Sequence, residues 1–205
     1  FGSANSLSLL AIPYFVIAGN IIMKARITDK LVNFADAAVG WLPGGLGHVN
    51  VLTSMIFGGI QGSGCADAAA IGGMLIPAME KQGYDKDYSV AVTAGSSMLS
   101  PIIPPSIAMI LYSYYTEVPV GRLFMGALVP GILLGILQMG VVYLEYRVRK
   151  YDIPRTRFSL KNLLITAWHS LGALMMPLII LSGICFGIVT PTESGVLAIL
   201  YGLLY

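Results

Sequence analysis

Apolar runs long enough to cross a lipid bilayer recur along this chain. Residues 7–25, 121–146 and 163–189 consist mainly of aliphatic and aromatic residues, and a spanning helix needs about 20 of these. Of the 205 residues, 56% are hydrophobic and 11% are charged, whereas soluble domains average about 25% charged residues. This fraction of charged residues is too small to form the polar surface of a water-soluble fold. The sequence therefore predicts a polytopic, all-α membrane protein.

Residues 27–42 predict a helix of another kind. Their apolar side chains recur at helical spacing, and acidic, basic and amide side chains lie on the opposite side. Such one-sided helices are typical of the membrane interface, where they lie in the plane of the bilayer. The Pro-Gly-Gly sequence at residues 43–45 is expected to end this helix.

Glycine interrupts the next apolar run, residues 48–80. Four glycines fall between Gly58 and Gly64, together with Gln61 and Ser63. Each glycine in a helix interior costs about 1 kcal/mol relative to alanine, so the cluster predicts a break. We expect one half-helix to end at residues 58–60 and another to start near residues 63–66. The two would form a re-entrant hairpin whose ends emerge on the same side of the membrane.

Charge in the loops favours the hairpin over a single crossing. The basic segment 147–161 is expected to be cytoplasmic, because positive charge gathers on that side. Counting spans backwards with a re-entrant hairpin places Lys24, Arg26 and Lys30 in the cytoplasm as well. A simple crossing by residues 48–80 would place these three cations outside.

A second interruption lies within residues 88–115, an apolar run that we expect to be a broken span. Its centre, residues 93–106, contains Pro101, Pro104 and Pro105, and proline cannot continue a helix because it lacks an amide proton and clashes with the preceding turn. Unwound backbone at bilayer depth occurs only against protein or around a water-filled cavity. The pattern therefore predicts a binding site without naming its ligand.

Three polar residues have a structural interpretation. Thr190, Pro191 and Glu193 form the pattern of a capping box that starts a final helix over residues 190–205. Asp67 is a carboxylate within an apolar segment, which makes it a functional candidate. It equally suits the first turn of the second half-helix, where the helix dipole stabilises negative charge. We favour this capping role for Asp67.

Several functional classes are disfavoured. A net charge of +2 gives no basic surface for nucleic acid, and the chain has no G-x-x-x-x-G-K-[ST] sequence for nucleotide phosphates. An intramembrane serine protease would need a glycine-serine motif that residues 60–65 (IQGSGC) do not provide, and an aspartyl protease would need a second deep carboxylate beside Asp67. We therefore expect no enzymatic activity and no cofactor. A channel remains a possible class.

Four segments of the chain, in order, resemble the large membrane subunit of TRAP (tripartite ATP-independent periplasmic) transporters. They are the opening FGSANSLSLLAIPYFVIAGN, the glycine-rich GGLGHVNVLTSMIFGGIQGSGCADAAAIGGMLIPAMEKQGYD, the segment TAGSSMLSPIIPPSIAMILY, and GIVTPTES. The resemblance covers essentially all 205 residues. It corresponds to the N-terminal half of that subunit, one half of an inverted-repeat transporter. The start at Phe1 and the apolar last residues also predict a piece of a longer chain.

The resemblance implies a sodium-coupled permease of the bacterial or archaeal inner membrane. Such permeases import organic acids, such as C4-dicarboxylates or sialic acid, that a periplasmic binding protein delivers, and a small four-helix membrane subunit accompanies them. The alternative is a sodium–carboxylate symporter of similar architecture that needs no binding protein. This sequence departs from the family at the hairpin tip, where Gln61 replaces the first serine of the usual Ser-Gly-Ser.

With Na⁺ as the coupling ion, oxygen ligands are expected, because Na⁺ is a hard cation. Unwound carbonyls and helix C-termini coordinate Na⁺ in broken-helix transporters, and helix N-termini face anionic substrates. We therefore predict a sodium site at the two breaks, formed by Gly59, Gln61, Ser63, Ser97 and Ser100. The predicted substrate contacts are Ser63, Thr93 and Ser106. We expect no metal other than Na⁺.

Overall fold

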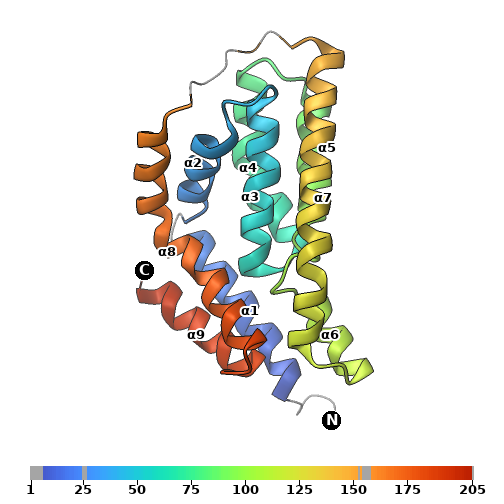
Figure 1. Ribbon diagram of the computed structural model, residues 1–205, viewed down its shortest axis with the longest axis vertical. Coiled ribbons are helices and arrows are strands. Elements are labelled where there is room, and N and C mark those ends of the chain that lie inside the picture. Colours follow the sequence, from blue (N-terminus) through green and yellow to red (C-terminus); the bar gives the residue numbers. More distant parts are fainter. Residues whose placement is uncertain (1–6, 25–26, 152, 154–157, 205) are drawn as a thin grey trace.

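The computed structural model describes residues 7–24, 27–151, 153 and 158–204. In this part of the chain all regular structure is helical, as predicted, and no strand occurs (Figure 1). The helices are α1 (Leu7–Lys24), α2 (Ile27–Val39), α3 (Gly45–Gln61), α4 (Gly64–Lys81), α5 (Lys86–Ser97), α6 (Ile107–Thr116), α7 (Val120–Arg149), α8 (Leu160–Cys185) and α9 (Pro191–Leu204).

Helices α7 and α8 are the longest apolar elements. They have 30 and 26 residues, or about 45 and 39 Å at 1.5 Å per residue, and within the described residues they alone are both long and apolar enough to cross a bilayer. Shorter apolar helical segments lie at Leu10–Ile21, Gly45–Ile60 and Pro191–Leu204. The first two overlap the span predicted at residues 7–25 and the hairpin predicted at residues 48–80, and the third lies within the final helix predicted at residues 190–205.

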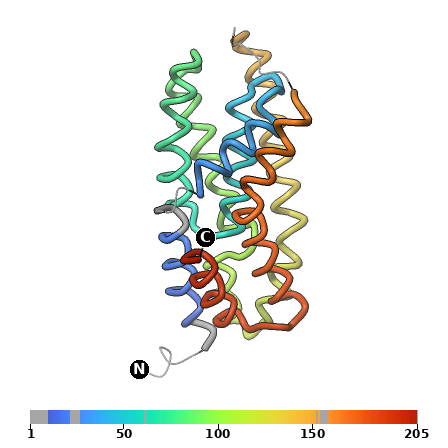
Figure 2. The backbone as a smooth tube through the Cα atoms, turned by 90° about the vertical axis from the view of Figure 1, so that its left-hand side faces the viewer, coloured from blue at the N-terminus to red at the C-terminus, as the bar shows by residue number. Residues whose placement is uncertain are grey.

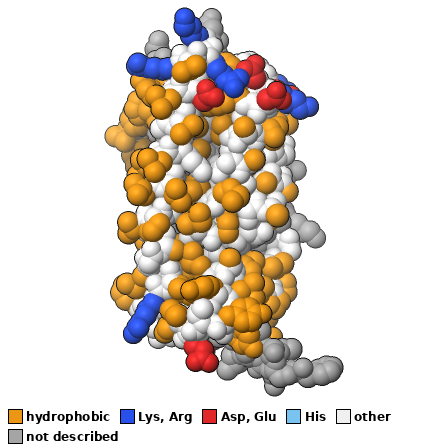
Figure 3. All heavy atoms as spheres, turned by 90° about the vertical axis from the view of Figure 1, so that its right-hand side faces the viewer, with side chains coloured by type: hydrophobic (Ala, Val, Ile, Leu, Met, Phe, Trp, Pro, Cys, Tyr) orange, Lys and Arg blue, Asp and Glu red, His pale blue; other side chains and the backbone are white. Residues whose placement is uncertain are grey.

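The exposed surface of α7 is strongly apolar. Leu133, Leu137 and Leu144 are 55%, 57% and 61% exposed. Figure 3, which views this side of the molecule, shows hydrophobic side chains over most of its height and charged side chains only toward the two ends. Water-soluble monomers rarely expose apolar patches of this extent. The surface is therefore suited to lipid or to another membrane-embedded protein.

Helix α3 lies at the centre of the bundle. It packs against α2, α4, α5 and α7, and α1 packs against α9 at the end of the bundle near the described N-terminus (Figures 1 and 2). Val49, Phe57 and Ile60 of α3 are fully buried, and burying a side chain of this kind contributes about 1.5–3 kcal/mol. The centre of the fold therefore carries the first arm of the glycine-rich segment.

Helix α4 turns back beside α3, so that the outer ends of both helices lie at the same end of the bundle (Figures 1 and 2). The chain then runs through α5, leaves helical geometry at residues 98–106, and resumes as α6. The bundle therefore contains two interrupted pairs of helices, α3–α4 and α5–α6.

Several helix boundaries differ by a few residues from the sequence-based expectation. Helix α3 continues through Gly58 and Gly59 and ends at Gln61, one residue beyond the expected end at residues 58–60. Both glycines keep helical geometry. Helix α8 ends at Cys185 and not at residue 189, because the chain turns at Gly187, whose φ is +70°.

Candidate functional site

The turn between α3 and α4 depends on Gly62. This residue has φ 62° and ψ 23°, the left-handed conformation, and its N–H donates to Gly58 O at 3.0 Å. Side chains with a Cβ rarely adopt this conformation, whereas glycine does so at little cost. Ser63 then takes an extended conformation and starts α4. Only two residues, Gly62 and Ser63, therefore separate the C-terminus of α3 from the N-terminus of α4.

The segment between α5 and α6 is held by turns. Leu99 N–H donates to Ser96 O at 2.9 Å, and Ile103 N–H donates to Leu99 O at 2.8 Å. Ser106 closes the segment: its hydroxyl donates to Pro101 O at 2.6 Å and accepts from Met109 N at 3.4 Å. Ser106 is therefore the N-cap of α6, and the prolines that rule out a helix lie between it and α5.

The two interruptions lie directly against each other. A Cβ atom placed on Gly58 would be 2.7 Å from Ser100 Cα, and one placed on Gly64 would be 3.0 Å from Ser97 O. Gly62 is equally close to Ser106, where the same Cβ would be 2.7 Å from its Cα. At Gly58 and Gly62 a Cβ atom would require the facing backbone to move, and at Gly64 it would be tightly packed against backbone. The ends of α3, α4, α5 and α6 therefore converge at one place.

The predicted sodium residues gather around this contact. Gly59 is buried, and a Cβ placed on it would lie 3.5 Å from Pro104 O. Ser97 Oγ donates to Ala94 O at 2.8 Å. Ser100 Oγ is buried and has no hydrogen-bond partner within the described part of the chain. Ser63 is half-buried and makes no capping hydrogen bond. The side chain of Gln61 lies outside the described residues.

The predicted substrate residues are not all at the same position. Ser63 and Ser106 belong to the convergence point, where Ser106 meets Gly62. Thr93 lies four residues before Ser97 in α5, about one helical turn away. It is buried against α3, accepts from Asn50 Nδ2 at 2.7 Å and donates to Ser89 O at 2.8 Å. The hydroxyl of Thr93 is therefore already occupied by protein partners.

Asp67 lies in the first turn of α4 and is completely buried. Its backbone N–H donates to Ser63 O at 3.0 Å, but neither carboxylate oxygen makes a hydrogen bond of ordinary geometry within the described residues. The hydroxyls of Ser100 and Ser54 approach the Asp67 carboxylate as hydrogen-bond donors, without reaching the geometry of an ordinary hydrogen bond. The favourable position of Asp67 relative to the helix dipole thus comes without a capping hydrogen bond.

Two buried polar residues of α3, Asn50 and Ser54, were not predicted from the sequence. Asn50 and Ser54 on α3 face Thr93 and Ser96 on α5. Asn50, Ser54 and Gly58 are spaced four residues apart, so they share one helix face. That spacing was the available signal, and it extends the polar surface from the convergence point along the α3–α5 interface.

Thr190 and Glu193 lie at the start of α9, away from the convergence point. Thr190 N–H donates to Glu193 Oε2 at 2.7 Å, and Glu193 N–H donates to Thr190 Oγ1 at 3.3 Å. This reciprocal pair is the geometry of a capping box at the start of α9. Within the described residues, no three His, Cys, Asp or Glu side chains come together as metal ligands.

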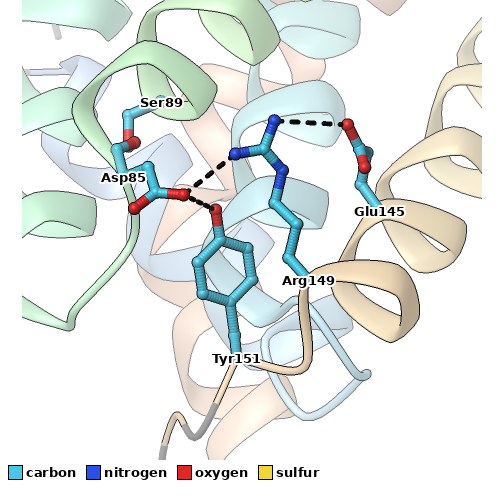
Figure 4. Close-up of polar contacts among 5 residues, drawn as sticks. All are labelled: Asp85, Ser89, Glu145, Arg149 and Tyr151. Carbon is cyan, nitrogen blue, oxygen red and sulfur yellow. Dashed lines mark hydrogen bonds and ion pairs between the residues drawn. The ribbon is translucent and has the colours of Figure 1, made fainter.

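A second polar cluster joins the α4–α5 loop to the end of α7 (Figure 4). Asp85 Oδ2 accepts from Tyr151 Oη at 2.8 Å and from Arg149 Nη1 at 2.9 Å. Glu145 Oε1 is 3.6 Å from Arg149 Nη2. The hydrogen bonds from Tyr151 and Arg149 hold the pKa of Asp85 below its ordinary value. The outer end of the interrupted pairs is thereby tied to α7.

Apolar exposed helices and a meeting point of four helix ends define the class: this is a helical membrane protein with interrupted helices, an arrangement used by membrane transporters. Over residues 1–205 the chain matches the family model described as "Tripartite ATP-independent periplasmic transporter, DctM component". The chain belongs to this family of integral membrane permeases.

Curated relatives agree with the family match. The isethionate TRAP transporter permease protein DctMQ of Oleidesulfovibrio alaskensis is 39% identical over 204 residues, covering 100% of this chain and 32% of the relative. The sialic acid TRAP transporter permease protein SiaT of Haemophilus influenzae is 36% identical over 203 residues, covering 98% of this chain and 33% of the relative. The C4-dicarboxylate TRAP transporter large permease protein DctM of Pseudomonas aeruginosa is 38% identical over 201 residues, covering 98% of this chain and 47% of the relative. The chain thus spans a third to a half of their length.

Proposed function

We propose that this chain is part of the permease subunit of a sodium-coupled secondary transporter that imports organic acids. The substrate class follows from the relatives, whose names specify isethionate, sialic acid and C4-dicarboxylates. All of these compounds are organic anions. The permease acts in the inner membrane of a bacterium or archaeon. A periplasmic binding protein delivers the substrate, and a small four-helix membrane subunit completes the complex.

The observation that carries this proposal is the convergence of four helix ends. The C-terminal ends of α3 and α5 bring carbonyl groups, and the N-terminal ends of α4 and α6 bring N–H groups, to one place. A helix carries roughly +0.5 of an elementary charge at its N-terminus and −0.5 at its C-terminus. A cation and a carboxylate are therefore both stabilised there, side by side, which is what coupled uptake of Na⁺ and an organic anion requires.

The sodium ligands in this proposal are Gly59, Gln61, Ser63, Ser97 and Ser100. Ser100 is supported most directly, because its buried hydroxyl has no partner within the described residues and a buried polar group without a partner costs about 1–3 kcal/mol. The substrate contacts in this proposal are Ser63, Ser106 and Thr93. For Thr93 to bind substrate, its hydroxyl must release its hydrogen bond with Asn50 or with Ser89.

The membrane topology in this proposal has α3 and α4 as a re-entrant hairpin, α5 and α6 as one broken span, and α2 in the interface. Positive charge supports the orientation, because Arg147, Arg149 and Lys150 close α7 at the end where α4 returns. This end is cytoplasmic by the positive-inside rule. The hairpin tip at Gly62 then lies within the bilayer, reached from the cytoplasmic side.

Uptake by the full-length permease, reconstituted in proteoliposomes with its small subunit, tests the proposal. The expected result is accumulation of a labelled organic acid that needs both an inward Na⁺ gradient and the added binding protein. Uptake that needs Na⁺ but is the same without any binding protein would instead identify a binding-protein-independent symporter. Flux that follows the substrate gradient alone, unaffected by Na⁺, would contradict sodium coupling and indicate a channel.

A further inference from the structure

The α3–α5 interface contains a chain of hydrogen bonds centred on Asn50. Asn50 Nδ2 donates to Thr93 Oγ1 at 2.7 Å, and Ser96 Oγ donates to Asn50 Oδ1 at 2.9 Å. Ser54 Oγ continues the chain by donating to Ser96 Oγ at 3.1 Å. All four residues are 3% exposed or less. These bonds are therefore shielded from water, which would otherwise compete for them.

Asn50 bonds two residues of the opposite helix through one amide group, just as Ser96 bonds two residues of α3. Thr93 and Ser96 are three residues apart on α5, so one amide group holds α5 at two adjacent positions along its axis. A single hydrogen bond would allow α5 to rotate or slide around it. Two bonds from one rigid, planar amide fix both the rotation and the axial register of α5 against α3.

This register determines how the two helix interruptions fit. Gly58 lies eight residues beyond Asn50 on the same α3 face, and Ser100 lies four residues beyond Ser96, in the non-helical segment that follows the end of α5. Helices transmit displacement along their length, and a shift by one residue moves the backbone by about 1.5 Å. A Cβ on Gly58 would already lie 2.7 Å from Ser100 Cα. A slide of that size would therefore misalign the convergence point.

We propose that Asn50 is a positioning residue that sets the register of α5 on α3 and so holds residues 98–106 against the α3–α4 turn. It makes no contact with the ion itself. Its effect on transport rests on the proposed function: the binding-competent arrangement of Ser97 and Ser100 is populated fully only while the Asn50 amide is in place. Removing the amide should therefore lower the apparent affinity for Na⁺ and leave the transport step itself intact.

An Asn50→Leu variant is suited to the test because the fold can tolerate it. Leucine has a similar size and is apolar, and both α5 hydroxyls retain a backbone acceptor: Thr93 Oγ1 donates to Ser89 O at 2.8 Å, and Ser96 Oγ lies 3.1 Å from Thr93 O. The matched control is Thr53→Val on the same helix. Thr53 is fully buried, and its hydroxyl has no partner within the described residues, so that loss of the hydroxyl leaves the register unchanged.

The first measurement is amide hydrogen exchange of the full-length permease complex in nanodiscs without Na⁺, and it does not depend on transport. Asn50→Leu should speed exchange over residues 98–106, and Thr53→Val should exchange as the wild type does. A second variant, Ser96→Ala, removes the same bond from the α5 side and should speed exchange in the same segment. Wild-type exchange over 98–106 in both Asn50→Leu and Ser96→Ala would overturn the inference.

The second measurement is the Na⁺ dependence of uptake in proteoliposomes. In Asn50→Leu the Na⁺ concentration for half-maximal uptake should rise about fivefold or more, with the maximal rate at saturating Na⁺ within about twofold of wild type. A fall in maximal rate at unchanged Na⁺ affinity would show that Asn50 serves folding alone. If exchange is faster in Asn50→Leu but uptake by the wild-type protein does not depend on Na⁺, the positioning role is upheld and the proposed function is refuted.

Discussion

Gly62 and Ser106 are 44 residues apart in the sequence, yet a Cβ atom on the glycine would lie 2.7 Å from Ser106 Cα. The contact joins the tip of the α3–α4 turn to the N-cap of α6. It leaves no room for a side chain at residue 62. The two interruptions of helix are therefore parts of one packed structure, and changes at either one should affect the other.

Replacing Gly62 with alanine should destabilise the protein. The left-handed backbone at φ 62° costs a non-glycine residue about 1–2 kcal/mol, and overpacking against Pro105 and Ser106 adds about 1–3 kcal/mol. The midpoint of thermal unfolding in detergent measures the loss. Gly73→Ala is the control, because Gly73 is helical and a Cβ there meets nothing within 4 Å. It should gain about 1 kcal/mol, and equal midpoints for the two variants would contradict the packing at Gly62.

Ser100→Ala should separate ion binding from folding. The Ser100 hydroxyl has no partner within the described residues, so its removal should not destabilise the fold and should raise the free energy of unfolding by about 1–3 kcal/mol. The Na⁺ concentration for half-maximal uptake should nevertheless rise. Ser113→Ala provides the opposite pattern, because Ser113 Oγ donates to Val118 O at 2.5 Å, at the far end of α6. It should lose stability but keep the wild-type Na⁺ dependence. An unchanged Na⁺ dependence in Ser100→Ala would remove Ser100 from the ion site.

The capping box of α9 should contribute measurably to stability. Thr190→Ala removes the oxygen that accepts from Glu193 N–H, and loss of such an N-cap costs about 1 kcal/mol. Glu193→Gln should lose less, because its amide oxygen can still accept from Thr190 N–H. Thermal unfolding of both variants checks the order. If the glutamine variant were the less stable of the two, the charge of Glu193 and not the cap geometry would dominate.

Acid should weaken the connection between the α4–α5 loop and α7. The pKa of Asp85 is held below its ordinary value of 3.8 by hydrogen bonds from Tyr151 and Arg149. The stabilisation from ionised Asp85 is therefore complete above that ordinary pKa and disappears as the pH falls through the lowered value. Tyr151→Phe removes one donor and should raise the pKa of Asp85. Carboxyl ¹³C NMR titration of labelled aspartate measures the shift, and an unchanged titration in Tyr151→Phe would show that Tyr151 has no such effect.

The sequence predicted the helical nature of the chain and the place of the first interruption, but not its detailed form. Four glycines between residues 58 and 64 predicted a break without showing which residue makes it. In the structure only Gly62 has a left-handed backbone among them, whereas Gly58 stays helical and accommodates Ser100. Local propensity could not distinguish these roles, because the need for glycine at residue 58 arises from a segment 42 residues away.

The polar contacts of Asn50 were beyond sequence reasoning for a similar reason. Asn50 and Thr93 are 43 residues apart, and their pairing depends on how α5 lies against α3. Ser106 was predicted as a substrate contact, and its position beside Gly62 agrees with the convergence of the two breaks, while its role toward substrate stays a prediction. Thr93 was predicted as a substrate contact together with Ser106, although its hydroxyl bonds within the α3–α5 interface.

Backbone-to-backbone contact at Gly58, Gly62 and Gly64 also bears on how relatives could diverge. Peptide carbonyls and amides are chemically the same whatever side chain a residue carries, so the proposed ion site, where backbone groups form it, would withstand mutation of the surrounding side chains. Selection for new cargo would then act on the side chains beside it, such as those of Gln61 and Cys65. One coupling ion could in this way be retained while the transported acid changed from one descendant to the next.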